Sequence, residues 1–271
     1  MLSVLNNVSS LNAENALSST QTSLQNSLLQ LSTGLKINSG SDDAAGLSIA
    51  NGLGANMAAL NQSSQNASNG IGLLQTADGA LSQVTTLLNR AVTLATEAAN
   101  GDLTTAQATA ANTEFQSILS EITQIGSTTN FNGSPVFTAT PQTVFTSDGT
   151  TGGTTTTSTT TGTLSATTLL LTGDLNSIAN ATTSLSAVTA AINTVAATRG
   201  TIGASVNQLA ADTNVENTEV TNLTSAQDNI QNADIGKTVA KMTEYNVLQQ
   251  TGMAALSQSN QAQQAILKLL Q

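Results

Sequence analysis

Apolar residues recur at alternating three- and four-residue steps along two long stretches that lie far apart in the chain. The first stretch runs from Ala50 to Ala98, with one extra three-residue step after Leu74. The second keeps a single heptad frame over residues 188–232. This spacing is typical of helices that pack side by side, and the extra step is typical of a coiled-coil discontinuity. It predicts a helix of roughly 80 Å over 42–98 and one of about 65 Å over the second stretch. Polar residues also occupy that second frame, at Arg199, Thr213, Glu216 and Gln227.

A shorter apolar pattern lies outside each of these stretches. Near one end, leucines fall on the same steps from Leu17 to Leu35, and the segment from Ile235 onward is apolar with very few charges. Pairing of the inner helices would bring these terminal segments together, with apolar faces too large for one chain to cover. Exposed apolar faces mark interaction sites, and repeated head-to-tail contacts produce open helical polymers. The candidate polymer contacts are Leu24, Leu28, Leu31, Leu35, Leu256, Ile266, Leu269 and Leu270.

Two breaks separate the helical segments of the first half. Ser41 or Asp42 is placed to accept the free N–H groups at the start of the 42–98 helix, and Asp43 suits its positive end. The turn at residues 100–102, Asn-Gly-Asp, is followed by a shorter apolar pattern. Its predicted inward face comprises Ala111, Phe115, Ile118, Ile122 and Ile125. Because the connection is short, we expect this helix to run antiparallel beside the first long one.

The middle of the chain changes character. Residues 131–135 read Phe-Asn-Gly-Ser-Pro, which is a turn signal, and threonines are interleaved with the apolar residues around it. The strands of a hairpin are predicted at Val136, Phe137, Val144 and Phe145. Residues 146–163 form a low-complexity tract of Thr, Gly and Ser, and residues 164–175 favour a further strand. The predicted fold is mainly α: a long antiparallel helical rod or coiled-coil bundle formed by the N- and C-terminal segments, with a small β-rich central insertion.

Composition argues against catalysis and against several classes of partner. The chain contains no His or Cys, so no imidazole can activate its hydroxyls and no thiolate can bind a metal. Asp42 and Asp43 are the only adjacent carboxylates, and helix capping explains them better than acid–base chemistry. Six scattered basic residues give no phosphate-binding patch. No run approaches the roughly 18 apolar residues that span a bilayer. We expect a protein that is not an enzyme, with no cofactor or metal and no nucleic-acid or membrane partner.

Four tracts of the sequence closely resemble blocks of the bacterial flagellins, in the same order. They read LSTGLKINSGSDDAAGLSIA at 31–50, LLNRAVTLATEAANG at 87–101, EFQSILSEITQIGSTTNFNG at 114–133 and NVLQQTGMAALSQSNQAQQAILKLLQ at 246–271. The resemblance covers about residues 1–135 and 185–271 and is highly specific. The residues between resemble no family.

The resemblance implies a structural subunit that self-assembles into the bacterial flagellar filament for swimming motility. The terminal segments 1–41 and 235–271 would form the inner filament core. Residues 42–137 and 185–234 would form a long-helix rod domain with a hairpin, and 138–184 an exposed variable insertion. The implied partners are other copies of the chain, the flagellar export apparatus and chaperone, and cap and junction proteins. The implied location is extracellular, in the filament, after export without a cleaved signal peptide.

Some flagellins are detected by Toll-like receptor 5 through a patch on their long helices, and Arg90, Leu94 and Glu114 occupy the matching positions. The simpler interpretation is that Arg90 and Glu114 solvate the helix surface or form salt bridges between subunits. The Thr/Ser-rich tract would suit O-linked sugars, which some flagellins carry.

Three other functions share part of this pattern. A hook–filament junction protein has similar ends, but the match at 31–50 and the full C-terminal block favour the filament subunit. A surface adhesin or polysaccharide-binding flagellin homologue would place its binding site within 138–184. The cytoplasmic hairpin of a chemoreceptor is also rich in heptads, but it turns at a short tip rather than at a threonine-rich insertion.

Overall fold

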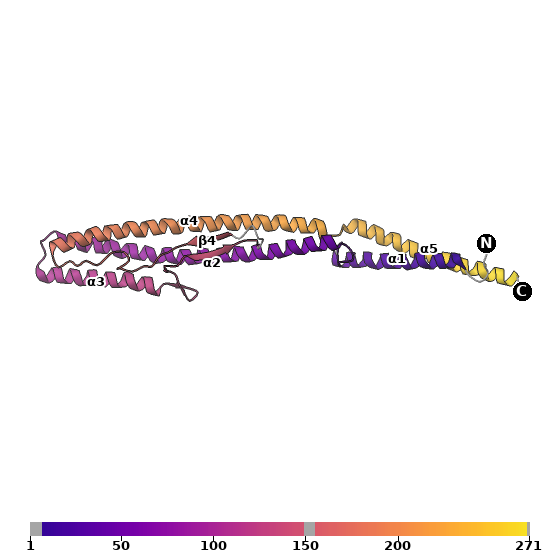
Figure 1. The fold of residues 1–271 in the computed structure, drawn as a ribbon, viewed down its shortest axis with the longest axis horizontal. Helices are drawn as coiled ribbons and strands as arrows, with labels where there is room; N and C mark the ends of the chain where they lie inside the picture. Colours follow the sequence, from indigo (N-terminus) through magenta and orange to yellow (C-terminus); the bar gives the residue numbers. More distant parts are fainter. Residues whose placement is uncertain (1–6, 149–154, 270–271) are drawn as a thin grey trace. The chain divides into compact units, whose positions relative to one another are not determined.

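The computed structural model describes residues 7–148 and 155–269, with side chains described for 7–148 and 156–265. Within these residues the chain is mainly helical, as the sequence predicts (Figure 1). The helices are α1 (Val8–Thr33), α2 (Ala44–Ala99), α3 (Thr105–Thr128), α4 (Ile178–Gln231) and α5 (Ile235–Leu269). The strands are β1 (Asn130–Phe131), β2 (Ser134–Pro135), β3 (Gln142–Thr146) and β4 (Thr155–Thr159). The chain divides into a terminal unit, residues 1–55 with 222–271, and a central unit, residues 56–221.

The central unit is built on antiparallel segments of α2 and α4, which are joined by contacts such as the ion pair between Asp78 and Arg199. Buried residues of α2 follow one another every three or four positions from Leu60 to Ala98. The α4 residues buried at every seventh position are Val188, Val195, Ile202 and Leu209, each at most 2% exposed. The heptad frame predicted for this helix is therefore confirmed. Each such side chain removed from water contributes about 1.5–3 kcal/mol, so this apolar ladder is the main stabilising feature of the unit.

The step in the α2 pattern lies earlier than the sequence predicts. The pattern places it after Leu74, whereas the structure places it between Leu60 and Ser63, after which burial continues without interruption. Ser63 and Gly70 are each buried one position before the residue that the pattern favours. The physical reason is local, because Ser63 hydrogen-bonds to Glu216 of α4 and Gly70 leaves room for β3.

The shorter helix α3 begins and packs as predicted. The Thr104 hydroxyl accepts a hydrogen bond from the Gln107 N–H at 3.4 Å, and Gln107 Oε1 accepts one from the Thr104 N–H at 2.9 Å. This reciprocal arrangement is a capping box. Of the predicted inward face, Phe115, Ile118 and Ile122 are buried and Ala111 and Ile125 are half-buried. A salt bridge to α2 and shared core residues fix α3 beside that helix.

Two short antiparallel strand pairs replace the single predicted hairpin. β1 pairs with β2 around Asn132-Gly133, whose φ angles of 50° and 80° are those of the turn that this dipeptide favours. β3 pairs with β4, with Val144 opposite Thr157, so the partner strand lies in the threonine tract. Val136 and Phe137 belong to no strand. They are 0% and 6% exposed, because these bulky side chains fill the core instead.

The strand suggested over 164–175 is wrong, and this segment is an irregular strap on α3. Its buried side chains are Leu164, Leu169, Leu171 and Leu175. Oxygen atoms of Thr123 and Asn112 on α3 accept hydrogen bonds from its backbone N–H groups at 3.1 and 2.9 Å, which replaces strand pairing. α4 then begins at Ile178, ten residues before the predicted start at 188. The last residues of the predicted insertion 138–184 are consequently helical.

In the terminal unit, α1 and α5 lie antiparallel (Figure 1). Leu35 forms a bridge with Asn232 next to one end of the pair. The Lys36 N–H donates to the Gln231 carbonyl at 2.6 Å, so the chain leaving α1 is fixed to the end of α4.

The turn between α1 and α2 uses two adjacent carboxylates for different purposes. Asp42 Oδ2 accepts from the N–H groups of Asn38 and Ser39 at 3.0 and 2.8 Å, which holds the pKa of Asp42 below its ordinary value. Asp43 Oδ1 accepts from the Gly46 N–H at 2.9 Å, inside the first turn of α2. The cap of α2 is therefore Asp43, rather than Ser41 or Asp42 as predicted. Asp42 instead closes the turn before the helix.

Candidate functional sites

In the helix pair α1 and α5, the most buried residues are small and polar. Ser27 of α1 and Thr238 of α5 are 5% and 6% exposed. Asn7 Nδ2 donates to Gln263 Oε1 at 3.1 Å across the pair. A helix pair in a folded globule normally turns its apolar stripe inward. Small inward side chains let the two helices approach closely but bury little apolar surface.

Large apolar side chains of the same two helices face solvent instead. We call the following nine the outer apolar residues: Val8, Leu11, Leu28 and Leu29 of α1, and Ile235, Val239, Val247, Leu248 and Met253 of α5. Their exposed fractions run from 39% at Val239 to 61% at Val8. Concentrated apolar exposure of this kind marks a surface that another molecule covers.

The predicted polymer contacts divide between the two sides of the pair. Those that the structure leaves half-buried are Leu24, Leu31, Leu35 and Leu256, whereas Leu28 is 47% exposed. The side chains of Ile266 and Leu269 and the whole of Leu270 lie outside the described residues. The leucine pattern of α1 places Leu28 on the inward face, but the structure buries Ser27 there. Leu24 and Leu31 keep their predicted half-buried positions, so the difference is confined to this position of the repeat.

The proposed receptor residues do not form one surface. Arg90 and Glu114 form a two-point ion pair, with Nε and Nη2 at 2.7 and 3.0 Å from the two carboxylate oxygens. Their side chains are 51% and 46% exposed. The hydrogen bond from Arg90 lowers the pKa of Glu114. Leu94 is only 3% exposed and belongs to the apolar core, so this part of the predicted patch is corrected.

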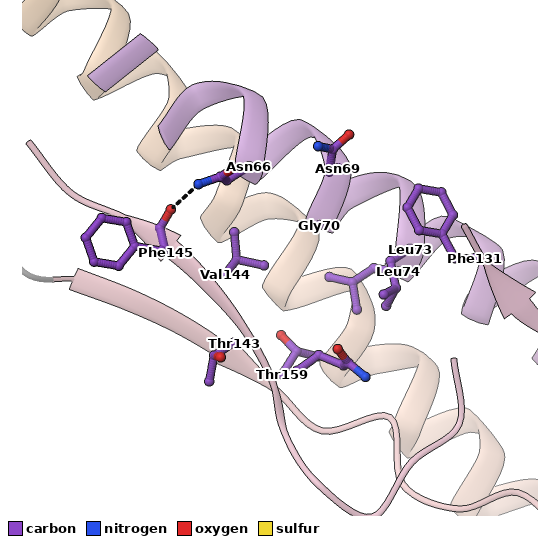
Figure 2. Close-up of a pocket in the computed structure, with 11 residues that line it drawn as sticks. Asn66, Asn69, Gly70, Leu73, Leu74, Phe131, Thr143, Val144, Phe145 and Thr159 are labelled. Atoms are coloured by element: carbon purple, nitrogen blue, oxygen red, sulfur yellow. Dashed lines mark hydrogen bonds between the residues drawn. The ribbon is translucent and has the colours of Figure 1, made fainter. Parts of the chain in front are cut away.

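A crevice of about 340 Å³ lies in the central unit where β3 crosses α2 (Figure 2). Val144 rests on Gly70, since a Cβ atom at Gly70 would lie 2.6 Å from Val144 Cγ2. Figure 2 shows the rings of Phe131 and Phe145 on either side, and Asn66 Nδ2 donates to the Phe145 carbonyl at 3.4 Å. None of the lining side chains titrates. The crevice thus has an apolar and amide lining, formed where β3 packs on α2.

The sequence reading missed one polar cluster that the structure assembles. Ser63 of α2, Glu216 of α4 and the backbone around Ser147 meet in the central unit. The available signal was Glu216 itself, a carboxylate in the inward heptad frame of α4. Its partner on α2 could not be chosen from the sequence, because the register of the two helices is set by the displaced step at Ser63.

The described residues contain neither a candidate metal-binding cluster nor a candidate membrane-spanning helix. No group of three or more His, Cys, Asp or Glu side chains in 7–148 and 155–269 is arranged to hold a metal ion. No helix in that part of the chain combines the length and apolarity needed to cross a bilayer.

Family models match both halves of the chain. The bacterial flagellin N-terminal helical region matches residues 4–142, and the bacterial flagellin C-terminal helical region matches residues 185–270. The unmatched residues between them include β4 and the strap on α3.

Individual relatives agree with the models. A flagellin of Halalkalibacterium halodurans is 34% identical over 248 residues, which cover 91% of each chain. A flagellin of Listeria monocytogenes is 30% identical and covers 99% of each chain. Among solved structures, a crystal structure of Bacillus cereus flagellin shares 27% identity and a TM-score of 0.49, over 56% of this chain and 88% of that one. With matched family models at both ends and relatives aligned over nearly its full length, the chain belongs to the bacterial flagellin family.

Proposed function

We propose that this chain is the structural subunit of a bacterial flagellar filament and that α1 and α5 carry its contacts with other copies. Membership of the flagellin family supports self-assembly into an extracellular filament. The observation that supports the assignment to α1 and α5 is the position of the outer apolar residues, which face solvent while Ser27 and Thr238 are covered. Covering a half-exposed leucine in a polymer contributes about 1 kcal/mol.

The finer organisation follows from the same proposal. Residues 1–41 and 235–271 form the inner core of the filament, 42–137 and 185–234 the rod around it, and 138–184 the central insertion. The insertion was predicted to be exposed, but Leu164, Leu169, Leu171 and Leu175 are buried against the central unit. The filament serves swimming motility. The chain leaves the cell through the flagellar export apparatus without a cleaved signal peptide, and a chaperone and the cap and junction proteins bind it on that route.

A matched pair of substitutions on α1 tests the contact surface. Leu28→Asn removes an outer apolar residue, and Gln25→Asn changes an exposed polar residue of the same helix. Both should leave the circular dichroism of the monomer unchanged. Leu28→Asn should raise the critical concentration for seeded elongation about fivefold or more, since about 1 kcal/mol of burial is lost, whereas Gln25→Asn should not. Equal elongation by the two variants, followed by light scattering and electron microscopy, would refute the assignment.

Truncation tests the whole terminal unit. Removal of about 20 residues from either end should abolish polymerisation, because the removed residues pack against other subunits in the filament. The central helices should persist, because they do not pack on the removed ends. A truncated chain that still forms seeded tubular filaments would contradict the proposal.

A receptor contact is a second proposal, supported only by the exposed ion pair of Arg90 and Glu114. We propose that Toll-like receptor 5 contacts this pair and does not contact the buried Leu94. Arg90→Ala should then lower signalling by receptor-expressing cells tenfold or more, about 1.4 kcal/mol of lost binding. Arg199→Ala, which breaks the other two-point ion pair of the central unit, is the matched control. Wild-type monomer that gives no signal would exclude this contact.

A further inference from the structure

One hydroxyl group of the central unit lies within hydrogen-bond distance of two acceptors, although it has a single proton to donate. Ser63 Oγ lies 2.5 Å from Glu216 Oε1 and 3.4 Å from the Phe145 carbonyl oxygen, and it accepts a hydrogen bond from the Ser147 N–H at 2.9 Å. A serine hydroxyl has one proton to donate and two lone pairs. It can therefore donate either to the Glu216 carboxyl or to the β3 carbonyl, but not to both.

The protonation state of Glu216 determines that choice. An ionised carboxylate is an acceptor only, so it takes the Ser63 proton in a charge-assisted bond. A protonated carboxyl at the same place donates to Ser63 Oγ, whose own proton is then available to the Phe145 carbonyl. In the first state β3 keeps one bond to Ser63, from the Ser147 N–H. In the second it has two.

The surroundings of Glu216 favour a response to protons. Glu216 is only 6% exposed, and its Oε2 atom is buried without a hydrogen-bond partner in the described part of the chain. It lines a cleft of about 380 Å³ with Asp212 and Glu219 of α4 and Asp148, which follows β3. From α2 only Leu60 lines the cleft, and no Lys or Arg is among the lining residues.

The surroundings of Glu216 shift the pKa of its carboxyl group upward on balance. Burial raises the pKa of Glu216, the Asp212 and Glu219 carboxylates raise it further, and the hydrogen bond from Ser63 opposes them. Asp212 also accepts a hydrogen bond from Thr157 of β4 at 3.1 Å, so both strands of this hairpin are held by the α2–α4 pair beside the cleft.

We propose that Glu216 and Ser63 form a proton-operated latch for the β3–β4 hairpin. With Glu216 protonated, Ser63 grips β3 at the Phe145 carbonyl and the Ser147 N–H. With Glu216 ionised, the hydroxyl turns to the carboxylate, the grip on Phe145 is released, and the hairpin moves more freely on α2. The latch adds a pH-sensitive element to the central unit that filament formation alone does not require.

The chain offers a direct probe, because it contains only four phenylalanines. Labelling their carbonyl carbons with ¹³C gives four NMR signals in the monomer, and Phe145→Leu identifies the one at β3. This signal should shift with pH around a midpoint above the ordinary glutamate value of about 4.3. The Glu216 carboxyl carbon, identified by loss of its signal in Glu216→Gln, should titrate with the same midpoint. Amide exchange of residues 144–146, corrected for its intrinsic pH dependence, should quicken about fivefold above the midpoint, the effect of one lost hydrogen bond.

Three variants distinguish the latch from a general loosening. Ser63→Ala and Glu216→Gln should each leave the Phe145 carbonyl signal flat with pH. Glu219→Gln, which alters the same cleft without touching Ser63, should keep the transition. A flat Phe145 signal in the wild-type chain, a transition that survives in Ser63→Ala, or a Glu216 carboxyl that titrates at the ordinary value would overturn the proposal. None of these measurements depends on polymerisation.

Discussion

At the scale of single residues, two glycines of α2 differ mainly in what faces them. A Cβ atom at Gly70 would lie 2.6 Å from Val144 Cγ2, whereas one at Gly79 would meet nothing within 4 Å. Helix propensity alone favours alanine over glycine by about 0.8–1 kcal/mol at both positions. We expect Gly79→Ala to raise the free energy of unfolding by about that amount. Gly70→Ala should lower it by about 1–2 kcal/mol, because overpacking displaces Val144.

Urea unfolding followed by circular dichroism measures both changes, and Gly79→Ala serves as the control for helix propensity. A gain in stability of equal size in the two variants would show that β3 is not seated on Gly70.

The buried Glu216 carboxyl predicts how stability depends on pH. Because burial raises its pKa, the folded chain holds this proton more tightly than the unfolded chain does. The resulting stability is complete below the ordinary glutamate pKa and is lost as the pH rises through the raised value. Glu216→Gln removes that loss. Its gain in melting temperature over the wild-type chain should therefore be larger at about pH 8 than at about pH 5.

Glu219→Gln is the matched control, since Glu219 is only half-buried in the same cleft. Asp78 acts in the opposite direction. Its hydrogen bond from Arg199 lowers its pKa, so its contribution is lost as the pH falls through that lowered value. A gain for Glu216→Gln that does not change with pH would contradict the assignment of the buried charge.

At the scale of elements, the start of α3 depends on one side chain. Thr104→Ala removes the hydroxyl of the capping box and should destabilise the central unit by about 1 kcal/mol. Thr109→Ala is the control, because the Thr109 hydroxyl only bonds back to the Thr105 carbonyl within the helix at 2.9 Å. That substitution should be neutral or slightly stabilising. Thermal unfolding of the two variants compares them, and similar melting temperatures would argue against the cap.

The elements that the sequence predicted well are those fixed by apolar periodicity. The frame of α4 from Val188 to Leu209 was predictable because every seventh residue is apolar. The structure buries each of these residues. The step in α2 was misplaced because a hydrogen bond at Ser63 outweighs the apolar preference of the neighbouring pattern. Val136 and Phe137 look like strand residues, yet long-range packing into the core decides their conformation. Threonine-rich β4 carries no apolar signal at all, so its pairing with β3 was out of reach.

The candidate sites, too, were predicted only in part. The ion pair of Arg90 and Glu114 joins two residues that the resemblance had grouped, but only the structure shows that Leu94 is buried in the core. The terminal leucines were predicted to form a polymer contact surface, and this stays a prediction. Their individual exposure could not be predicted, because Ser27 rather than the neighbouring Leu28 is buried.

At the scale of the whole molecule, apolar burial is distributed very unevenly. Every residue of the buried apolar cluster lies between Ala67 and Leu209, inside the central unit. In the described part of the terminal unit, the buried apolar side chains are Ile37 and Ala50. Ordering each residue costs about 1–2 kcal/mol of backbone entropy. The small buried apolar surface of the terminal unit offsets this cost only marginally. Burial of their outer apolar residues in a polymer would supply the difference.

The basic residues of the chain turn this contrast into a trypsin experiment. Lys36, Lys237 and Lys241 are exposed in the terminal unit, whereas Arg90 and Arg199 belong to the central unit and are held in ion pairs. In the monomer we expect cleavage after the lysines first, because proteolysis follows the population of locally unfolded chain. The product should begin after Lys36 and end at Lys237. In filaments the lysines should become as resistant as the arginines, since polymer contacts then stabilise α1 and α5. Mass spectrometry of a digestion time course gives the order of cleavage in the monomer and in filaments. Early cleavage after Arg90 in the monomer would show that the central unit is not the more stable part.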